Sequence, residues 1–509
     1  MNTVLPEKAY QTVCQAPIKL ASNKTKIVCT IGPASESPEI LLEMIQAGMN
    51  IARLNFSHGD FDWHLNVIQN LRRAALLAGQ RITILADLPG PKMRIGPLES
   101  EPVYLNKGDL FNLTSEAIVG NQERVSVSFQ NLAAVVSPGD LLSLNDGIIQ
   151  LEVLQVVGHD VQCQLRMGGE LRSHKGINLP GISLGISAFT EHDKACLLFA
   201  LENGVDAISQ SFVETAADIA AVRLAANEKG YDPFIIAKIE RAAALNEIDE
   251  ILRVSDGIMV ARGDLGVETP LEQIAVIQKQ LIRKANQLGK PVITATQMLA
   301  SMVDHFRPTR AESTDVANAI LDGSDCVMLS EESALGQFPV QAVKMLVLIA
   351  TATEPSRSLN QTKTVFDEYK RTTDVNLVDF ISRNVLHAVE QLSPLAVIVP
   401  TVSGYTARMV ARFMLPVWIL GVSPHEATCH RLQFSYGVLP FYAPVHPADW
   451  NSFAKSWGQV AGLTEGVLVL ARGPYPDQQK SNHRLEIIDL RPGHVWNQAP
   501  LTDSVESEN

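Results

Sequence analysis

The chain has 509 residues, of which 46% are hydrophobic and 19% charged, and its formal net charge is −13. That length exceeds a single compact core and predicts about three domains. The negative charge argues against nucleic acid and anionic membranes as partners, but net charge says nothing about a local basic pocket for phosphates.

The cysteines and the N-terminal sequence indicate a reducing compartment. The six cysteines are scattered, with no Cys-x-x-Cys pair and no clustering with histidine, so neither disulfides nor structural zinc are expected. The opening MNTVLPEKAYQ lacks the charged and apolar regions of a signal peptide. Apolar runs fall far short of the roughly 20 residues that span a bilayer. We therefore expect a cytoplasmic protein without a membrane segment.

The first part of the chain alternates strands with helices. One helix is predicted to begin with Ser37 as its N-cap and Pro38 in its first turn, and to close near Gly48. The next extends from 61 to 78 and stops at Gly79. Apolar runs typical of buried parallel strands lie at 27–30, 51–55 and 82–86.

From about residue 91 to 186 the pattern changes to short β-like runs separated by Gly, Pro, Asn and Asp, with no helix of any length. The predicted strands are 110–113, 125–129, 141–144, 148–157 and 161–165. This indicates a small all-β domain inserted into the α/β chain.

The alternation resumes with a helix near 192–202. Five further strands are predicted at 206–209, 235–237, 258–261, 292–295 and 326–329. Together with the first three they make eight βα units, which favours a TIM (β/α)8 barrel over the alternative, a doubly wound sheet. The barrel would comprise residues 1–90 and 187–355, and the inserted domain, 91–186, would be a lid over its mouth.

A third region follows the polar linker SRSLNQTKT. A helix at 377–392 and strands at 396–400, 417–421, 438–442 and 467–470 predict a separate α/β domain spanning residues 365–509. The final residues, SVESEN, are expected to be disordered.

Polar side chains follow the barrel strands where those strands end, on the face at which active sites of parallel α/β folds form. Glu240 and Asp264 would bring two oxygen ligands to one point, which suits Mg²⁺ or Mn²⁺. Lys238 supplies a cation beside them. The other strand-end residues are Arg53, Asn55, Ser57, His58, Asp87, Ser211, Arg262, Thr296 and Glu332.

A site with arginine, lysine and a divalent metal suits a phosphorylated or carboxylated substrate. The chain has no Walker A sequence and no Gly-x-Gly-x-x-Gly after a strand, so any nucleotide must lie between barrel and lid. Two reactions remain open on these grounds: phosphoryl transfer, and metal-assisted enolate chemistry such as that of a class II aldolase. The lid and the arginines favour phosphoryl transfer.

Several long motifs resemble those of pyruvate kinases, in the same order, between Lys24 and about Leu490. They are KTKIVCTIGPAS, MNIARLNFSHG, IIAKIE, SDGIMVARGDLGVE, GKPVITATQML and RPTRAESTDVANAILDG. The resemblance implies Mg²⁺-dependent phosphoryl transfer from phosphoenolpyruvate to ADP, giving pyruvate and ATP, by a homotetramer. A paralogue that keeps the fold as a regulatory or binding protein is the competing interpretation. The presence of Lys238, Glu240 and Asp264 favours the enzyme.

The resemblance also implies a role for each matching residue. Glu240 and Asp264 match the divalent-metal ligands, and Lys238 matches the lysine that stabilises the transferring phosphoryl group and the enolate. Arg53 matches the arginine that contacts the substrate phosphate. Thr296 matches a threonine near the substrate carboxylate that is implicated in the proton path. The implied carboxylate site adds the backbone N–H groups of Gly263 and Asp264, and the implied ADP contacts are Pro33, Asn55, His58, Arg94 and Lys175. Asp146 matches a lid residue that reaches the site on closure.

One departure concerns the monovalent cation. Many members carry Asp-Thr-Lys-Gly-Pro-Glu-Ile-Arg-Thr, but this chain has Leu88 for the threonine and Lys92 for the glutamate. The pattern resembles the K⁺-independent branch, and a fixed ammonium can replace a cation electrostatically. We expect Lys92 to do the work of K⁺ in the region of Asn55, Ser57 and Asp87. The alternative is that Lys92 is only a solvated lid lysine.

The third domain contains PTVSGYTARMV, a strand followed by a hydroxyl-rich loop and a helix start, which can present N–H groups and hydroxyls to a phosphate. It resembles the sugar-phosphate effector site of allosteric pyruvate kinases, carried here by Thr401, Ser403, Gly404 and Thr406. The later loop GPYPDQQKSNHR departs from that of members activated by fructose-1,6-bisphosphate. We therefore expect a sugar monophosphate or AMP, with simple helix capping as the alternative.

Overall fold

The computed structural model describes residues 20–145, 147–182, 184–357, 376–473 and 483–491. Within these ranges eight parallel strands close into a barrel in the order β1-β16-β15-β14-β13-β12-β3-β2. Their bounds are β1 (Lys26–Thr30), β2 (Ile51–Asn55), β3 (Thr83–Leu88), β12 (Ala207–Gln210), β13 (Phe234–Ile239), β14 (Gly257–Ala261), β15 (Val292–Ala295) and β16 (Cys326–Leu329). The closed order confirms the TIM barrel and excludes the doubly wound sheet.

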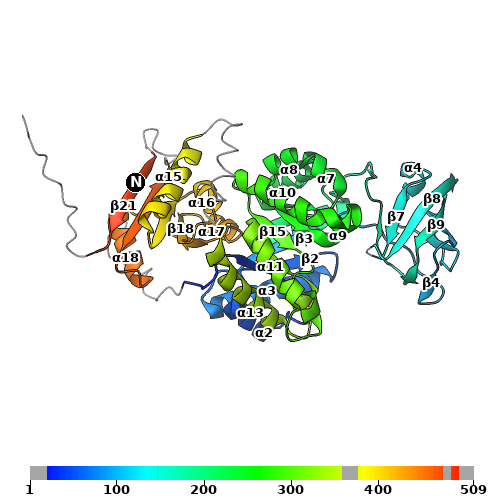
Figure 1. The fold of residues 1–509 in the computed structure, drawn as a ribbon, viewed down its shortest axis with the longest axis horizontal. Coiled ribbons are helices and arrows are strands. Elements are labelled where there is room, and N and C mark those ends of the chain that lie inside the picture. Colours follow the sequence, from blue (N-terminus) through cyan, green and yellow to red (C-terminus); the bar gives the residue numbers. More distant parts are fainter. Residues whose placement is uncertain (1–19, 146, 183, 358–375, 474–482, 492–509) are drawn as a thin grey trace, which may run out of the picture.

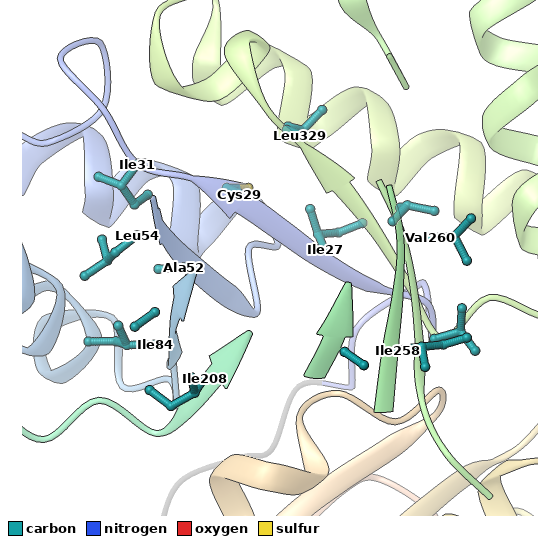
Figure 2. Packing of buried hydrophobic residues seen from close by; sticks show 14 of the residues in the cluster. Ile27, Cys29, Ile31, Ala52, Leu54, Ile84, Ile208, Ile258, Val260 and Leu329 are labelled. Atoms are coloured by element: carbon teal, nitrogen blue, oxygen red, sulfur yellow. The ribbon is translucent and has the colours of Figure 1, made fainter. Parts of the chain in front are cut away.

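Helices surround the barrel and bury apolar side chains against the outward faces of its strands (Figure 2). They are α2 (Pro38–Ala47), α3 (Phe61–Ala78), α5 (Glu191–Glu202), α6 (Ala216–Asn227), α7 (Ala242–Asn246), α8 (Ile248–Val254), α9 (Arg262–Glu268), α10 (Ile274–Gln287), α11 (Arg310–Asp322), α12 (Glu331–Ala334) and α13 (Pro339–Thr353), with 3₁₀ turns at η1 (Leu271–Gln273), η2 (Ala300–Val303) and η3 (Glu354–Ser356). The predicted capping is present: the Ser37 side chain accepts from the Ile40 N–H, and Gly79 closes α3 in the left-handed conformation. None of the described helices is long and apolar enough to cross a bilayer.

The barrel interior changes from apolar to polar along its axis. Side chains at the strand starts, such as Val28, Ile51 and Leu85, form an aliphatic cluster. Because side chains alternate across a strand, the residues two positions further on also face inward. These inward positions include Thr30, Arg53, Asp87, Ser209 and Lys238, so the polar layer lies at the carboxyl end of the strands.

At four places in the barrel, a polar residue that directly precedes one strand bonds to the backbone of the neighbouring strand. The polar residues precede β2, β12, β14 and β16, and the strands they bond to are β1, β3, β13 and β15. Each side-chain oxygen accepts a hydrogen bond from the first or second backbone N–H of the adjacent strand, which satisfies a donor at the barrel edge. The pairs are Asn50 with Ile27 at 2.9 Å, Asp206 with Ile84 at 2.7 Å, Asp256 with Ile235 at 2.9 Å and Asp325 with Val292 at 3.0 Å.

The inserted domain lies at one end of the molecule, beyond the barrel (Figure 1). Its described residues form a six-stranded sheet in the order β11-β7-β8-β9-β5-β6 and a two-stranded sheet of β10 and β4, around a core of their own. The bounds are β4 (Val103–Leu105), β5 (Leu110–Thr114), β6 (Arg124–Ser126), β7 (Leu141–Leu144), β8 (Ile149–Val157), β9 (Asp160–Met167), β10 (Gly169–Leu171) and β11 (Ile177–Asn178). The only described helix in it is the four-residue α4 (Leu132–Val135), in agreement with the predicted β character.

The C-terminal domain lies at the other end of the molecule (Figure 1) and is a separate α/β unit, as expected. Its elements are α15 (Leu377–Leu392), β17 (Ala396–Pro400), α16 (Tyr405–Ala411), β18 (Trp418–Ser423), α17 (Glu426–Leu432), β19 (Val438–Tyr442), α18 (Trp450–Val460), β20 (Val467–Arg472) and β21 (Arg484–Asp489), with the described strands ordered β19-β18-β17-β20-β21. The sequence analysis missed β21, which pairs antiparallel with β20 at the sheet edge. The domain boundaries given above stay predictions, and the final SVESEN lies outside the described residues.

The C-terminal domain closes the barrel at the strand starts, opposite the polar layer. Phe434 is fully buried in the interior cluster and stacks on Phe234 with ring centroids 5.4 Å apart. Beside it, the Tyr436 N–H donates to Asp325 Oδ1 at 2.8 Å, and Lys26 Nζ donates to the Val438 carbonyl at 2.6 Å. The segment from 434 to 438 therefore connects this domain directly to β1 and β16.

Candidate active site

Arg53 and Asp87 form the centre of the polar layer. Arg53 Nε and Nη2 both donate to Asp87 Oδ2, at 2.9 and 2.5 Å, and Nη1 donates to Thr30 Oγ1 at 2.8 Å. The Ser209 hydroxyl donates to the other oxygen, Asp87 Oδ1, at 2.5 Å. Burial alone would raise the pKa of Asp87, but Lys238, Arg53 and the Ser209 hydrogen bond together hold it below its ordinary value.

Lys238 lies in the same layer as a second buried cation. Its Nζ donates to Ser211 Oγ at 2.6 Å and lies 3.5 Å from Asp87 Oδ2 and 3.3 Å from Glu240 Oε2. Burial by itself would lower the pKa of Lys238, yet the carboxylates of Asp87 and Glu240 outweigh it and raise the pKa. The lysine is therefore a fixed positive charge beside Arg53.

Glu240 follows β13 and is almost fully buried, with 1% of its surface exposed. Its Oε1 accepts from the Phe212 N–H at 2.6 Å, and Phe212 has a left-handed backbone with φ of 57° that turns this N–H towards the carboxylate. Burial raises the pKa of Glu240 to about 7, and the charge of Asp264 adds to the rise while Lys238 opposes it.

Glu240 and Asp264 fit a divalent cation. A cation held by both would relieve the repulsion between these carboxylates, and oxygen donors suit Mg²⁺ or Mn²⁺. No cluster of three or more His, Cys, Asp or Glu ligands occurs in the described part of the chain. Mg²⁺ characteristically uses one or two carboxylates and completes its shell with water and substrate phosphates, so two protein ligands are sufficient.

Thr296 lies just beyond β15, where the chain turns sharply. Thr296 and Gln297 both have positive φ values, 68° and 54°, which is a strained backbone for residues other than glycine. Thr296 Oγ1 accepts from the Gly263 N–H at 2.8 Å and donates to the Ala295 carbonyl at 2.6 Å. The Gly263 N–H expected to face a substrate carboxylate is thus bonded to the threonine hydroxyl, so a bound carboxylate would have to replace that bond.

Arg262 holds this turn in place rather than facing the charged layer. Its Nη2 donates to the Thr296 carbonyl at 2.7 Å, and its Nη1 lies 2.7 Å from Asp315 Oδ2 on α11. Glu332, beyond the eighth strand, likewise fastens backbone, accepting from the N–H groups of Leu299 at 3.0 Å and Ser330 at 2.6 Å.

The residues expected to contact a nucleotide come from the barrel and from the segments that lead into and out of the inserted domain. His58 is exposed, yet partial burial of its imidazole lowers its pKa, and the nearby positive charges of Lys92, Arg94 and Arg53 lower it further. Arg94 Nη1 donates to the His174 carbonyl at 2.9 Å, and Lys175 is the next residue. Pro33 follows Gly32, which packs tightly against the Ala334 backbone: a Cβ on Gly32 would lie only 2.7 Å from the Ala334 carbonyl oxygen. Asp146 lies outside the described residues.

The expected monovalent-cation region has Asn55 next to Asp87 in register, with Asn55 Oδ1 accepting from the Ser57 N–H at 3.2 Å. The Lys92 side chain is exposed, and among the described residues its ammonium has no hydrogen bond or ion pair. The role of Lys92 stays a prediction. Leu88 points outward into the core between barrel and helices.

The expected effector residues form a compact turn before α16. Thr401 Oγ1 accepts from the Gly404 N–H at 3.0 Å, and Ser403 Oγ accepts from the Tyr405 N–H at 3.4 Å. Gly404 has a φ of 81°, and Thr406 lies against Gly473 at the end of β20. Both hydroxyls therefore cap the turn in this structure.

Comparisons with known proteins agree with this geometry. The family described as "Pyruvate kinase, barrel domain" matches residues 22–343, and "Pyruvate kinase, alpha/beta domain" matches residues 379–471. The chain belongs to the pyruvate kinase family. It is 46% identical over 427 residues to the pyruvate kinase of Thermococcus litoralis, covering 83% of this chain and 90% of that protein. It is 45% identical over 425 residues to the pyruvate kinase of Geobacillus stearothermophilus (83% and 72% covered) and 42% identical over 461 residues to pyruvate kinase 2 of Synechocystis (87% and 77% covered).

Membership of the pyruvate kinase family makes this chain a phosphotransferase enzyme of glycolysis. Two residues of the site, Thr30 and Ser209, are absent from the candidates that the sequence offers. Thr30 and Ser209 bond directly to Arg53 and Asp87, yet neither was singled out, because each looks like an ordinary polar residue within a buried strand. The available signal was their inward register, in line with Arg53 and Asp87 on the neighbouring strands.

Proposed function

We propose that this pyruvate kinase family member transfers the phosphoryl group of phosphoenolpyruvate to ADP in a Mg²⁺-dependent reaction that gives pyruvate and ATP; Mn²⁺ is the alternative metal. The observation that supports this most strongly is the pairing of Arg53 and Lys238 on one buried carboxylate, Asp87, next to Glu240. Two fixed cations in a water-poor layer suit a substrate that carries both a phosphate and a carboxylate.

In this proposal Arg53 binds the substrate phosphate, and Lys238 stabilises negative charge on the transferring phosphoryl group and on the enolate oxygen. Gly263, Asp264 and Thr296 bind the substrate carboxylate, and the Thr296 hydroxyl takes part in proton delivery to the enolate. A divalent ion held by Glu240 and Asp264 would neutralise phosphoryl oxygens as a Lewis acid. All of these groups come from strand ends or the turns after them, so they are fixed before the substrate binds.

The nucleotide is proposed to lie between barrel and lid. Its contacts are Pro33, Asn55 and His58 from the barrel, with Arg94 and Lys175 from the segments that lead into and out of the lid. The low pKa of His58, caused by burial and by nearby cations, supports a neutral imidazole at neutral pH that can accept or donate a hydrogen bond.

We further propose that turnover does not require K⁺, with Lys92 supplying the positive charge near Asn55, Ser57 and Asp87. The proximity of Lys92 to His58 supports this position for the charge. The exposed ammonium would have to turn inward when substrates bind.

A sugar monophosphate or AMP is proposed as an activator that binds Thr401, Ser403, Gly404 and Thr406. The support is a glycine-containing turn at the carboxyl end of a parallel strand, where phosphates bind in open α/β sheets. We also propose a homotetramer in the cytoplasm, on the grounds of family membership and of cysteines that are unpaired wherever they are described.

The deciding experiment is steady-state pyruvate formation from phosphoenolpyruvate and ADP with Mg²⁺, in K⁺ buffer and in K⁺-free buffer. Activity in both supports the enzyme and its K⁺ independence, whereas activity only with K⁺ removes the role of Lys92. No activity in either buffer, even with sugar phosphates added, would refute the proposed reaction. Isothermal titration with sugar monophosphates and AMP tests the effector site, and absence of binding by all of them would remove it.

A further inference from the structure

Ser209 is a buried serine of the polar layer whose hydroxyl bonds directly to Asp87. It lies on β12 directly across from Asp87 on β3 in the parallel register, and it is fully buried. Because Ala207 and Ser209 point to the same side of the strand, the serine lies inside the barrel, one layer above the aliphatic cluster.

The bonds of Asp87 are divided unequally between its two oxygens. Arg53 and Lys238 both approach Oδ2, the arginine at 2.9 and 2.5 Å and the lysine at 3.5 Å. Among the described residues, Oδ1 accepts only from the Ser209 hydroxyl, at 2.5 Å. Within the part of the chain that the structure describes, the serine is thus the single partner of the oxygen that faces away from both cations.

Bonds to both oxygens restrict the rotation of the Asp87 carboxylate. The terminal torsion of an aspartate is broad, so a carboxylate held through one oxygen can rotate about its Cβ–Cγ bond. Held through both oxygens, it presents Oδ2 in one direction. Arg53 is then fixed between Asp87 and Thr30, and Lys238 between Asp87, Ser211 and Glu240.

We propose that Ser209 is a positioning residue for the phosphoryl-transfer reaction: its hydroxyl locks the Asp87 carboxylate so that Oδ2 orients Arg53 and Lys238 towards the substrate phosphate. The inference rests on the proposed function of those two cations. Ser209 itself touches no reacting atom, so its influence passes entirely through Asp87.

The roles assigned to the cations predict which kinetic constants change. Ser209→Ala leaves Asp87 Oδ1 without its donor and loosens the carboxylate, so the KM for phosphoenolpyruvate rises and kcat falls, with kcat/KM for this substrate lower by about 10- to 100-fold. The KM for ADP stays within about twofold, because its proposed contacts do not pass through Asp87. Ser209→Thr keeps the hydroxyl and restores most of the loss.

The matched control is Ser324→Ala. Ser324 is also a fully buried serine with a side-chain hydroxyl partner, Thr294 Oγ1 at 2.7 Å, but it lies in the turn between α11 and β16, at the strand-start end of the barrel. Its loss is expected to lower the melting temperature while leaving the KM for phosphoenolpyruvate unchanged. If Ser209→Ala does not fold, Ser209→Cys fills the site with a slightly larger side chain of the same shape and a weaker donor, and it is expected to show the same change in smaller measure.

The experiment is therefore a kinetic comparison of the full-length wild type, the Ser209 variants and Ser324→Ala, with thermal melts of each. A selective rise in the KM for phosphoenolpyruvate, reversed by threonine, supports the inference. Unchanged kinetics in a folded Ser209→Ala or Ser209→Cys variant, or KM values that rise equally for phosphoenolpyruvate and ADP, overturns it. An inactive wild type would instead refute the proposed function, and this inference with it.

Discussion

Replacing Lys238 with methionine is the sharpest test of the charge arrangement in the barrel. Methionine keeps an unbranched, mainly apolar side chain of similar length and removes the ammonium charge. We expect kcat to fall by two to three orders of magnitude, while the KM for ADP changes little.

The magnitude follows from the contacts of Nζ. It lies 3.3 Å from Glu240 Oε2 and 3.5 Å from Asp87 Oδ2, so each pair interacts by about 5 kcal/mol at an effective dielectric constant near 20. That attraction acts on the resting enzyme, and removing one partner of such a buried pair typically costs about 3–5 kcal/mol of stability. Only charge that develops during transfer counts towards the rate, and losing one preorganised donor in such a site costs about 10²–10³ in kcat.

The assay is continuous detection of pyruvate at saturating Mg²⁺, with thermal melts to confirm that Lys238→Met is folded.

Lys238→Arg is the control that keeps the positive charge but changes the geometry of the group that carries it. We expect it to recover little of the lost kcat, because a planar guanidinium cannot occupy the place of the ammonium between Ser211 and Glu240. A folded methionine variant that keeps kcat within about tenfold of the wild type would show that the reasoning on preorganised charge is wrong.

Three further predictions concern residues outside the expected site list. Thr30→Val removes the acceptor of Arg53 Nη1 and should lower kcat/KM for phosphoenolpyruvate by about tenfold or more, since a hydrogen bond to a charged group is typically worth about 1.5–3 kcal/mol; an unchanged value would contradict a role for this contact. Phe434→Ala opens the lower end of the barrel and should cost about 3–5 kcal/mol, measured by denaturant unfolding, whereas a loss below about 1 kcal/mol would mean that the ring is not a packing element. Burial lowers the pKa of His64 to about 4, so its neutral form is favoured in the folded state: the stability is complete above pH 6.5 and is lost as the pH falls towards 4. His64→Gln should therefore flatten the fall in melting temperature between pH 7 and pH 4.5, and a parallel fall in both proteins would exclude His64 as the cause.

Much of the fold could be predicted because local signals agreed with tertiary structure. Each barrel strand is a short, mainly apolar run with a polar residue in its last two positions or directly after it. Helices such as α2 carry explicit caps at Ser37 and Gly48. Strand β21 escaped prediction because RLEIID, with its charged residues, becomes a strand only through pairing with β20.

The site was predictable to the extent that its residues follow strand ends. Lys238, Glu240, Arg53 and Asp87 do meet in one layer. The partners that hold them could not be derived, because Ser209 is 122 positions from Asp87 in the chain and the two meet only through barrel register. The hydrogen bond between Thr296 and the Gly263 N–H could not be predicted either, because it depends on the positive φ of Thr296, for which the sequence carries no signal.

The docking of Phe434 has a consequence for the order in which the newly made protein matures. Strand β16 ends at Leu329, but the Phe434 ring, which closes the barrel at the strand starts, is synthesised about a hundred residues later. While the chain emerges from the ribosome, the eight strands can assemble before that ring arrives, and the floor around Phe234 and Cys326 then stays open to water. We expect a nascent chain that stops at 357 to bind an apolar dye, and one extended through 491, with the whole described C-terminal sheet, to release it. Docking of the C-terminal domain would therefore complete the folding of the barrel after all eight of its strands have been synthesised.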